Sequence, residues 1–264
     1  MLFAVDVGNT QTTAALFDQE KIVESWRFIT LRQETADGLA ARLYSLFAVK
    51  GRSLDQIDGL ALASVVPTQQ ASWKELTRFY LWTFFDLNAT SATDAGSGIM
   101  VDLDRPEEVG ADRIANAVAA AALYTLPAII VDFGTATTFD CVAPPGRYLG
   151  GAILPGLAVS LDALSQRAAK LPRVDLSAPP PAVVGGNTVD AIKSGLLHGA
   201  GALVDGMKQR IAREQGWDQP AVILTGGLAH LVAPFIETTT MVDQDLTLHG
   251  LRIMYQARLE TENR

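Results

Sequence analysis

The chain has 264 residues, of which 48% are apolar and 19% are charged, as in an ordinary globular protein with room for one large or two ordinary domains. Its formal net charge of −8 argues against a nucleic-acid-binding protein, because such binding draws most of its free energy from neutralising phosphates. The single cysteine, Cys141, excludes an internal disulfide and a CxxC metal or redox site.

The first half of the chain predicts strands and helices in an α/β order. Residues 3–5 and 13–17 form two predicted strands around the polar turn "DVGNTQT", residues 22–30 a third, and residues 60–66 a fourth that Pro67 ends. Two predicted helices carry apolar faces, made of Leu39, Leu43, Leu46 and Phe47 and then of Trp73, Leu76 and Tyr80. Composition predicts a loop over "NATSATDAGSG", residues 88–98.

The opening pattern recurs near the middle of the chain. A predicted helix over residues 112–124 precedes the strand "AIIVDFG" and the β-compatible run "TATTFDCVA". The segment that begins at Asp132 repeats the one at Asp6: an apolar strand, Asp, one apolar residue, Gly, a hydroxyl-rich turn and a second strand. A repeat this short can arise by chance, but the shared context indicates a duplicated α/β lobe.

The second half continues with the same alternation. A "PPG" turn and the strand "GRYLGGAIL" precede a predicted helix over residues 157–169, and "APPPAVVGG" reads as a loop. Asn187 is a predicted N-cap for a long helix whose apolar face carries Ile192, Leu196, Leu203, Met207 and Ile211. The strand "AVILTGG" and a last helix over residues 246–258 complete the chain.

No stretch is predicted to cross a membrane. The most apolar one, residues 114–131, is divided by Pro127 into an alanine-rich helix and a short strand. Asp6 interrupts the N-terminus too early for the apolar region of a signal peptide, and no basic segment precedes it. With the single cysteine, these features predict a cytoplasmic protein.

Three glycine-containing strand ends are the candidate chemical sites. They are Asp6-Val-Gly-Asn-Thr, Asp132-Phe-Gly-Thr and Thr225-Gly-Gly, whereas no P-loop, dinucleotide fingerprint or histidine-rich metal motif occurs. Ligands of open α/β sheets gather beyond the carboxyl ends of strands, so these turns are predicted to surround one nucleotide. A local pocket for an anion is compatible with the acidic chain.

The two aspartates accept hydrogen bonds, so their place beside phosphates makes sense through a cation. Mg²⁺ with its retained waters, or a monovalent cation, fits Asp6 or Asp132. The alternative is that each aspartate supports its own turn as an Asx residue.

The stretch "EEVGADRIANA" contains a further carboxylate at a predicted helix start. Asp112 is either an N-cap or a base that accepts the proton of an attacking hydroxyl group. Arg113 beside it is either a surface residue or the group that orients an anionic substrate.

Together the motifs "DVGNT", "GADRIANAV", "VDFGTATTFD", "GGAILPG", "RAAKLPRV", "GNTVDAIKSG", "LTGGLA" and "TLHGL" resemble the type III pantothenate kinases over nearly the whole chain. The resemblance implies the acetate and sugar kinase, Hsp70 and actin superfamily, an α/β fold of two duplicated ribonuclease H-like lobes with mixed sheets flanked by helices and a nucleotide cleft between them. The expected lobes are residues 1–118, with the first phosphate segment, and residues 119–264, with the second phosphate segment and the adenosine segment.

The resemblance also implies ATP-dependent phosphorylation of the 4′-hydroxyl of pantothenate, the first step of coenzyme A synthesis, in a homodimer whose partner subunit helps to form the substrate pocket. Asp112 resembles the general base, Asp132 the ligand of a monovalent cation (K⁺ or NH₄⁺), and Asp6 the residue that reaches Mg²⁺ through water. The implied ATP contacts are Asp6, Val7, Gly8, Asn9, Thr10, Gln11, Thr12, Thr13 and Thr135. The implied pantothenate contacts are Gly110, Ala111, Asp112, Arg113 and Thr188.

Two positions differ from the family pattern. Leu103 stands near the place of a tyrosine that touches pantothenate in many relatives, and Thr12 and Thr13 stand where some relatives have a lysine, which predicts weak ATP binding. The alternative functions are a catalytically idle regulator of the same fold and another small-molecule kinase of the superfamily. The joint presence of Asp6, Asp112, Asp132 and Thr135 favours the enzyme, and "GADR" with "GNTVDAIKSG" favours pantothenate.

Overall fold

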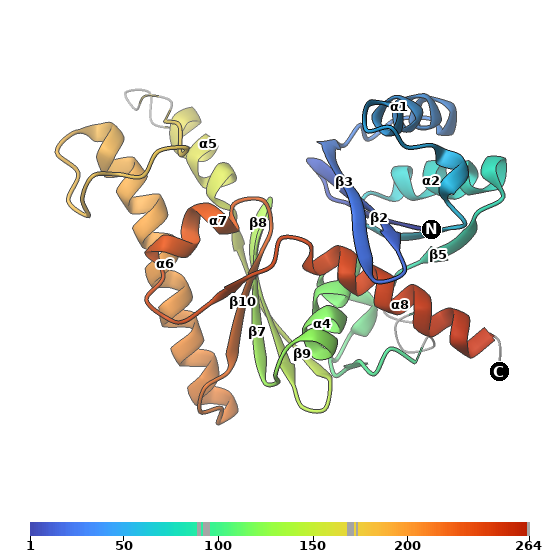
Figure 1. Cartoon of the computed structure of the whole chain (residues 1–264). Coiled ribbons are helices and arrows are strands. Elements are labelled where there is room, and N and C mark those ends of the chain that lie inside the picture. The colour runs from blue at the N-terminus through green and yellow to red at the C-terminus, as the bar shows by residue number, and fades with distance from the viewer. Residues whose placement is uncertain (89–90, 92–95, 168–171, 173, 263–264) are drawn as a thin grey trace. The chain divides into compact units, whose positions relative to one another are not determined.

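The computed structural model describes residues 1–88, 91, 96–167, 172 and 174–262. Contacts within the chain divide it into two compact units, Met1–Ala122 with Leu246–Arg264, and Leu123–Asp245 (Figure 1). Each unit is a mixed β-sheet flanked by helices. The predicted α/β class is therefore confirmed.

Unit 1 contains a sheet of order β3-β2-β1-β4-β5. The strands β1 (Leu2–Val7), β2 (Gln11–Asp18) and β3 (Lys21–Ile29) pair antiparallel, and β4 (Gly59–Ser64) and β5 (Thr83–Asp86) continue the sheet in parallel with β1. The predicted hairpin is thus confirmed. β5 was not predicted, because four residues are too short to show a periodic pattern.

Side-chain alternation decides how the helices of unit 1 pack. Phe3, Val5 and Leu16 point to one face of the sheet, where the apolar stripes of α1 (Ala36–Val49) and α2 (Pro67–Tyr80) form the core. Phe17 points to the other face, where its ring contacts His249 of α8 (Leu246–Glu262). The described part of the unit also contains the 3₁₀ turns Leu54–Gln56 and Pro106–Glu108, β6 (Met100–Val101) and α4 (Ala111–Leu123).

The last helix, α8, packs within unit 1, against elements from the first half of the chain. A Cβ on Gly250 of α8 would lie 2.0 Å from the carbonyl oxygen of Ala115, so α8 packs directly on the backbone of α4. The Thr247 hydroxyl donates to Oδ1 of the buried Asn116 at 2.7 Å. The expected division into residues 1–118 and 119–264 therefore differs from the compact units mainly in α8, whose partners are far away in sequence.

Unit 2 repeats the strand order of unit 1. The strands β7 (Ala128–Phe133), β8 (Ala136–Ala143) and β9 (Arg147–Pro155) pair antiparallel, and β10 (Ala221–Thr225) and β11 (Met241–Val242) continue the sheet in parallel with β7. Within this six-stranded sheet, the order β9-β8-β7-β10-β11 matches the order β3-β2-β1-β4-β5 of unit 1. This match confirms the duplication predicted from the two hairpins.

Helices cover one face of the second sheet. The core residues Ile129, Val131 and Phe139 point toward α5 (Leu157–Arg167), α6 (Thr188–Gln215) and α7 (Ala229–Val232), which the 3₁₀ turn Ala233–Phe235 follows. Residues 168–169 of the helix predicted over 157–169, and residues 89–90 and 92–95 of the predicted loop, lie outside the described residues. In the described part of the chain, no helix has the length and apolar character to cross a membrane.

Candidate active site

The first glycine turn connects β1 to β2 through Gly8, Asn9 and Thr10. The Gly8 N–H donates to the Gln11 carbonyl at 3.1 Å, and a Cβ on Gly8 would lie 2.9 Å from that oxygen. Thr30, at the end of β3, donates its hydroxyl to the Gly8 carbonyl at 2.8 Å and its N–H to the Thr10 carbonyl at 3.0 Å. The turn therefore has a fixed backbone whose tip, at Asn9 and Thr10, is exposed.

Two successive cross-strand pairs flank this turn, and they point to opposite faces of the sheet. Val7 and Thr12 are a cross-strand pair on the buried face, and the Thr12 hydroxyl lies 2.9 Å from that of Thr30. A ligand would meet only their backbone. Asp6 and Thr13 are the neighbouring pair on the other face, and both are half-buried.

The second turn repeats this arrangement at the end of β7. Asp132 and Thr138 form the cross-strand pair that corresponds to Asp6 and Thr13. The Gly134 N–H donates to the Ala136 carbonyl at 3.0 Å. The connection holds two residues, Gly134 and Thr135, where the first turn holds three.

The Asp132 carboxylate lies against the third glycine turn. Thr225, the last residue of β10, pairs with Asp132, and the following Gly226 has φ +88°. A Cβ on Gly226 would lie 2.3 Å from Asp132 Oδ1 and 2.7 Å from the backbone of Phe133. Only glycine allows the second and third turns to meet around this carboxylate.

Gly156 packs against the backbone of the second turn, a contact that was not predicted from the sequence. Its N–H donates to the Thr135 carbonyl at 3.1 Å, and its Cβ would lie 2.5 Å from the carbonyl oxygens of Gly134 and Thr135. Gly156 directly precedes α5, so the turn rests on the start of that helix. The signal was present only as the glycine that ends "GGAILPG".

Asp112 lies in the first turn of α4 and is partly buried. Burial raises the pKa of its carboxyl group above the ordinary value of 3.8, although the N–H and the charge of Arg113 oppose this rise. Its Oδ1 accepts the Arg113 N–H at 2.9 Å. A Cβ on Gly110 would lie 2.4 Å from the same oxygen, so the glycine leaves the space that the carboxylate occupies.

Asp112 and the first glycine turn are connected within unit 1 through Val65. A Cβ on Gly110 would lie 3.8 Å from Cγ1 of Val65, and the Val65 N–H donates to the Val7 carbonyl at 3.1 Å. Val7 immediately precedes Gly8. The structure thus brings the predicted base close to the strand end that carries the predicted phosphate turn.

Thr188 is exposed at the first position of α6. The preceding Asn187 caps the helix, since its Oδ1 accepts the Asp190 N–H at 3.0 Å and its amide group donates to Asp190 Oδ2 at 2.7 Å. The predicted N-cap is confirmed. Leu103, near the family tyrosine position, is half-buried between β6 and the turn Pro106–Glu108.

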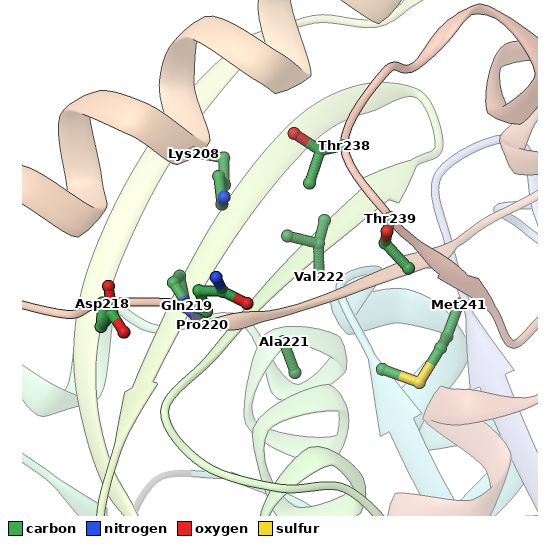
Figure 2. Close-up of a pocket in the computed structure, with 9 residues that line it drawn as sticks. All are labelled: Lys208, Asp218, Gln219, Pro220, Ala221, Val222, Thr238, Thr239 and Met241. Carbon is green, nitrogen blue, oxygen red and sulfur yellow. The ribbon is translucent and has the colours of Figure 1, made fainter.

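A cavity of about 470 Å³ in unit 2 lies at the other end of the sheet. Figure 2 shows Lys208, Thr238 and Met241 around the beginning of β10, at Ala221 and Val222. Ala221 pairs with Ala128 at the start of β7, whereas Asp132 lies near its end. None of the residues that line this cavity is a predicted site residue, so this cavity does not mark the candidate site.

Comparisons with known proteins identify the family of the chain. The family model described as type III pantothenate kinase matches residues 2–210. A type III pantothenate kinase of Geotalea uraniireducens is 44% identical over 261 residues, covering 99% of this chain and 100% of the relative. One of Halalkalibacterium halodurans is 42% identical over 256 residues, covering 97% and 99%.

The fold has solved counterparts as well. The crystal structure of the ROK hexokinase from Thermus thermophilus superimposes with a TM-score of 0.52 at 16% identity, covering 96% of this chain and 97% of the hexokinase. This match confirms the expected α/β fold of two mixed sheets flanked by helices. From the family model and these near full-length relatives, the chain belongs to the type III pantothenate kinase family.

Proposed function

We propose that this chain transfers the γ-phosphoryl group of ATP to the 4′-hydroxyl of pantothenate, which forms 4′-phosphopantothenate and ADP in coenzyme A synthesis. Family membership supports the reaction. The structural observation that carries it is the chain of neighbours from Asp112 through Gly110 and Val65 to Val7. Through these neighbours a partly buried carboxylate lies near β1, the strand that leads into the first glycine turn.

The glycine turns fit the phosphates of a nucleotide. A side chain at Gly8 or Gly226 would collide with neighbouring atoms, and the exposed tip of the first turn presents backbone and hydroxyl groups. The proposed ATP contacts are Asp6, Val7, Gly8, Asn9, Thr10, Gln11, Thr12, Thr13 and Thr135. For Val7 and Thr12 the contact runs through the backbone, because their side chains are buried.

Cations complete the proposed nucleotide site. No group of three or more His, Cys, Asp or Glu side chains in the described residues could hold a metal ion. Asp6 would hold Mg²⁺ through water, which suits an ion that retains several of its waters. The Asp132 carboxylate, beside the backbone of Phe133 and Gly226, offers oxygen ligands for K⁺ or NH₄⁺.

Asp112 acts as the general base. The pantothenate hydroxyl oxygen attacks the γ-phosphorus, its proton passes to the Asp112 carboxylate, and the bond from phosphorus to the ADP oxygen breaks. Burial raises the pKa of Asp112, which makes the ionised carboxylate a stronger base. Mg²⁺ would offset the charge that develops on the phosphate oxygens.

The proposed pantothenate contacts are Gly110, Ala111, Asp112, Arg113 and Thr188. Pantothenate carries a carboxylate, and a guanidinium group binds carboxylates through paired N–H donors, which suits Arg113. The exposed Thr188 hydroxyl is available to a ligand or to a second subunit. The proposed assembly is a homodimer, to be checked by light scattering of the purified protein.

Release of ADP from ATP, Mg²⁺ and pantothenate tests the proposal. The assay is run in K⁺, NH₄⁺ and Na⁺ with the wild type, Asp112→Asn and Asp132→Asn. We expect pantothenate-dependent turnover in K⁺ or NH₄⁺, a loss of about 10²- to 10⁴-fold in kcat for Asp112→Asn, and loss of the cation response for Asp132→Asn.

The matched control is Glu107→Gln, which removes an exposed carboxylate just before α4 and should leave turnover unchanged. Folded wild-type protein that shows no turnover in any cation would contradict the kinase and favour the regulator.

A further inference from the structure

The first glycine turn contains no basic side chain. Residues 6–13 read "DVGNTQTT", in which the only charged group is the Asp6 carboxylate. A nucleoside triphosphate brings several negative charges to such a turn, and backbone N–H groups offset these charges only in part. Charge-assisted contacts with Arg or Lys are the strong ones in phosphate recognition.

Arg32 places a guanidinium group at this turn. Its Nη2 donates to Oδ1 of Asn9, at the exposed tip, with a distance of 3.3 Å. Arg32 itself is exposed and lies just beyond β3, two residues after the Thr30 that braces the same turn. Two segments separated by more than twenty residues thus combine the phosphate-type backbone and a cation.

The backbone that carries Arg32 is anchored to α2. The Thr68 hydroxyl donates to the Arg32 carbonyl at 2.5 Å, and the buried amide group of Gln69 donates to the Leu31 carbonyl at 2.6 Å. The Ser72 hydroxyl donates to the Glu34 carbonyl at 2.8 Å. The position of Arg32 is therefore fixed by the fold, while its charged end remains accessible.

The charge of Arg32 is not neutralised by a neighbour. The nearby Glu34 forms its ion pair with Arg42, and no carboxylate in the described residues lies within ion-pair distance of Arg32. A shallow surface depression, open to solvent, is lined by Leu31, Arg32, Gln33 and Glu34. There is space for an anion beside the guanidinium group.

We propose that Arg32 binds the phosphates of the nucleotide at the Gly8–Thr10 turn and supplies the positive charge that the turn itself lacks. The guanidinium group has five N–H donors in a planar fork, so it contacts Asn9 with one and offers others to phosphate oxygens. This inference rests on the nucleotide site of the proposed function, which it deepens by one residue.

The test is titration with ATP, followed by phosphorus NMR, together with the KM for ATP in the ADP-release assay. We compare the wild type, Arg32→Gln and Arg32→Lys with Arg78→Gln, which removes an exposed arginine of α2 elsewhere in the same unit. For Arg32→Gln we expect the Kd and KM for ATP to rise about tenfold to a hundredfold, with an unchanged KM for pantothenate and an unchanged melting temperature.

Two further readouts separate phosphate binding from a structural role. Arg32→Lys should recover part of the affinity, and the dependence of the Kd for ATP on salt should be weaker in Arg32→Gln than in the wild type or Arg78→Gln. An ATP affinity of Arg32→Gln within about twofold of the wild type would overturn the inference while leaving the kinase intact. A wild type that binds ATP without turnover would refute the kinase, and the binding comparison would still decide the role of Arg32.

Discussion

Asp112 combines a proposed catalytic role with a cost to stability. Burial raises the pKa of its carboxyl group, so between the unfolded value of 3.8 and the folded value the folded chain binds more protons than the unfolded chain. The contribution of Asp112 to the free energy of unfolding therefore rises as pH falls through the folded pKa. Above that pKa, the buried charge destabilises the fold.

Asp112→Asn should therefore be more stable than the wild type at pH 8, by roughly 1 kcal/mol or about 2–4 °C in melting temperature, although its kcat is reduced. Asparagine keeps the oxygen that accepts the Arg113 N–H and removes only the charge. Thermal unfolding of both proteins from pH 4 to pH 8 measures the difference, which should shrink on the acid side. A constant difference across this range would contradict the raised pKa.

The acid limb of the pH profile of kcat/KM should report the same carboxylate. A general base must be ionised, so activity should fall as pH falls through the raised pKa of Asp112, at a pH above 3.8. Steady-state rates from pH 4 to pH 8 give this limb. The Glu107→Gln control should keep it, whereas an acid limb below 3.8 would exclude Asp112 as its source.

Gly226 is the residue at which the second and third turns meet. Its φ of +88° disfavours any side chain, and a Cβ would enter the space of Asp132 Oδ1. Gly226→Ala should lower the free energy of unfolding by about 1–3 kcal/mol and abolish the response to K⁺. Urea unfolding and ADP release in K⁺ and Na⁺ are the measurements.

The matched control for Gly226→Ala is Gly206→Ala, in the interior of α6. A Cβ there meets nothing within 4 Å, so alanine should stabilise the helix by about 0.5–1 kcal/mol and keep the cation response. Equal effects of the two substitutions would show that the turns do not depend on glycine at position 226.

At the scale of elements, the start of α6 connects helix capping to the proposed substrate contact. Asn187→Ala removes the acceptor of the Asp190 N–H and should cost about 1 kcal/mol of stability. Because Thr188 is the first residue of the helix, fraying should also raise the KM for pantothenate more than it lowers kcat. Chemical unfolding and steady-state kinetics provide both numbers.

Asn187→Ser serves as the comparison, since serine also accepts a hydrogen bond at the N-cap. It should preserve both stability and the KM for pantothenate. An unchanged KM in Asn187→Ala would separate Thr188 from the substrate site.

The elements that the sequence predicted well are those whose signal is local. The two hairpins at Asp6 and Asp132 were recognisable because strand, glycine and hydroxyl-rich turn lie within a dozen residues. The start of α6 was predicted because Asn187 is a common N-cap residue. Thr30 and Gly156 were not recognised as supports of the turns. Their contacts depend on strand pairing and helix placement, which no short window contains.

For the whole molecule, the same limit applies to α8. A helix was predicted over residues 246–258, but only the packed structure places it on α4, β1 and β4, more than a hundred residues away in sequence. Gly250 on Ala115 and Tyr255 beside Gly59 are the contacts that decide this. Unit 1 is therefore complete only when the last helix has been made.

A chain that ends at Asp245 should for this reason lose the cooperative folding of unit 1. The truncation exposes the sheet face of Phe17 and the backbone of Ala115, which α8 covers in the intact protein. Hydrogen exchange should show loss of protection in β1 and β4, together with loss of ADP release, while β7 and β10 of unit 2 stay protected. A chain that ends at Leu259 keeps the buried part of α8, from Leu246 to Tyr255, and should retain protection in both units. If the shorter chain kept β1 and β4 protected, unit 1 would fold without its last helix, and the division of the chain at residue 118 would be the better description.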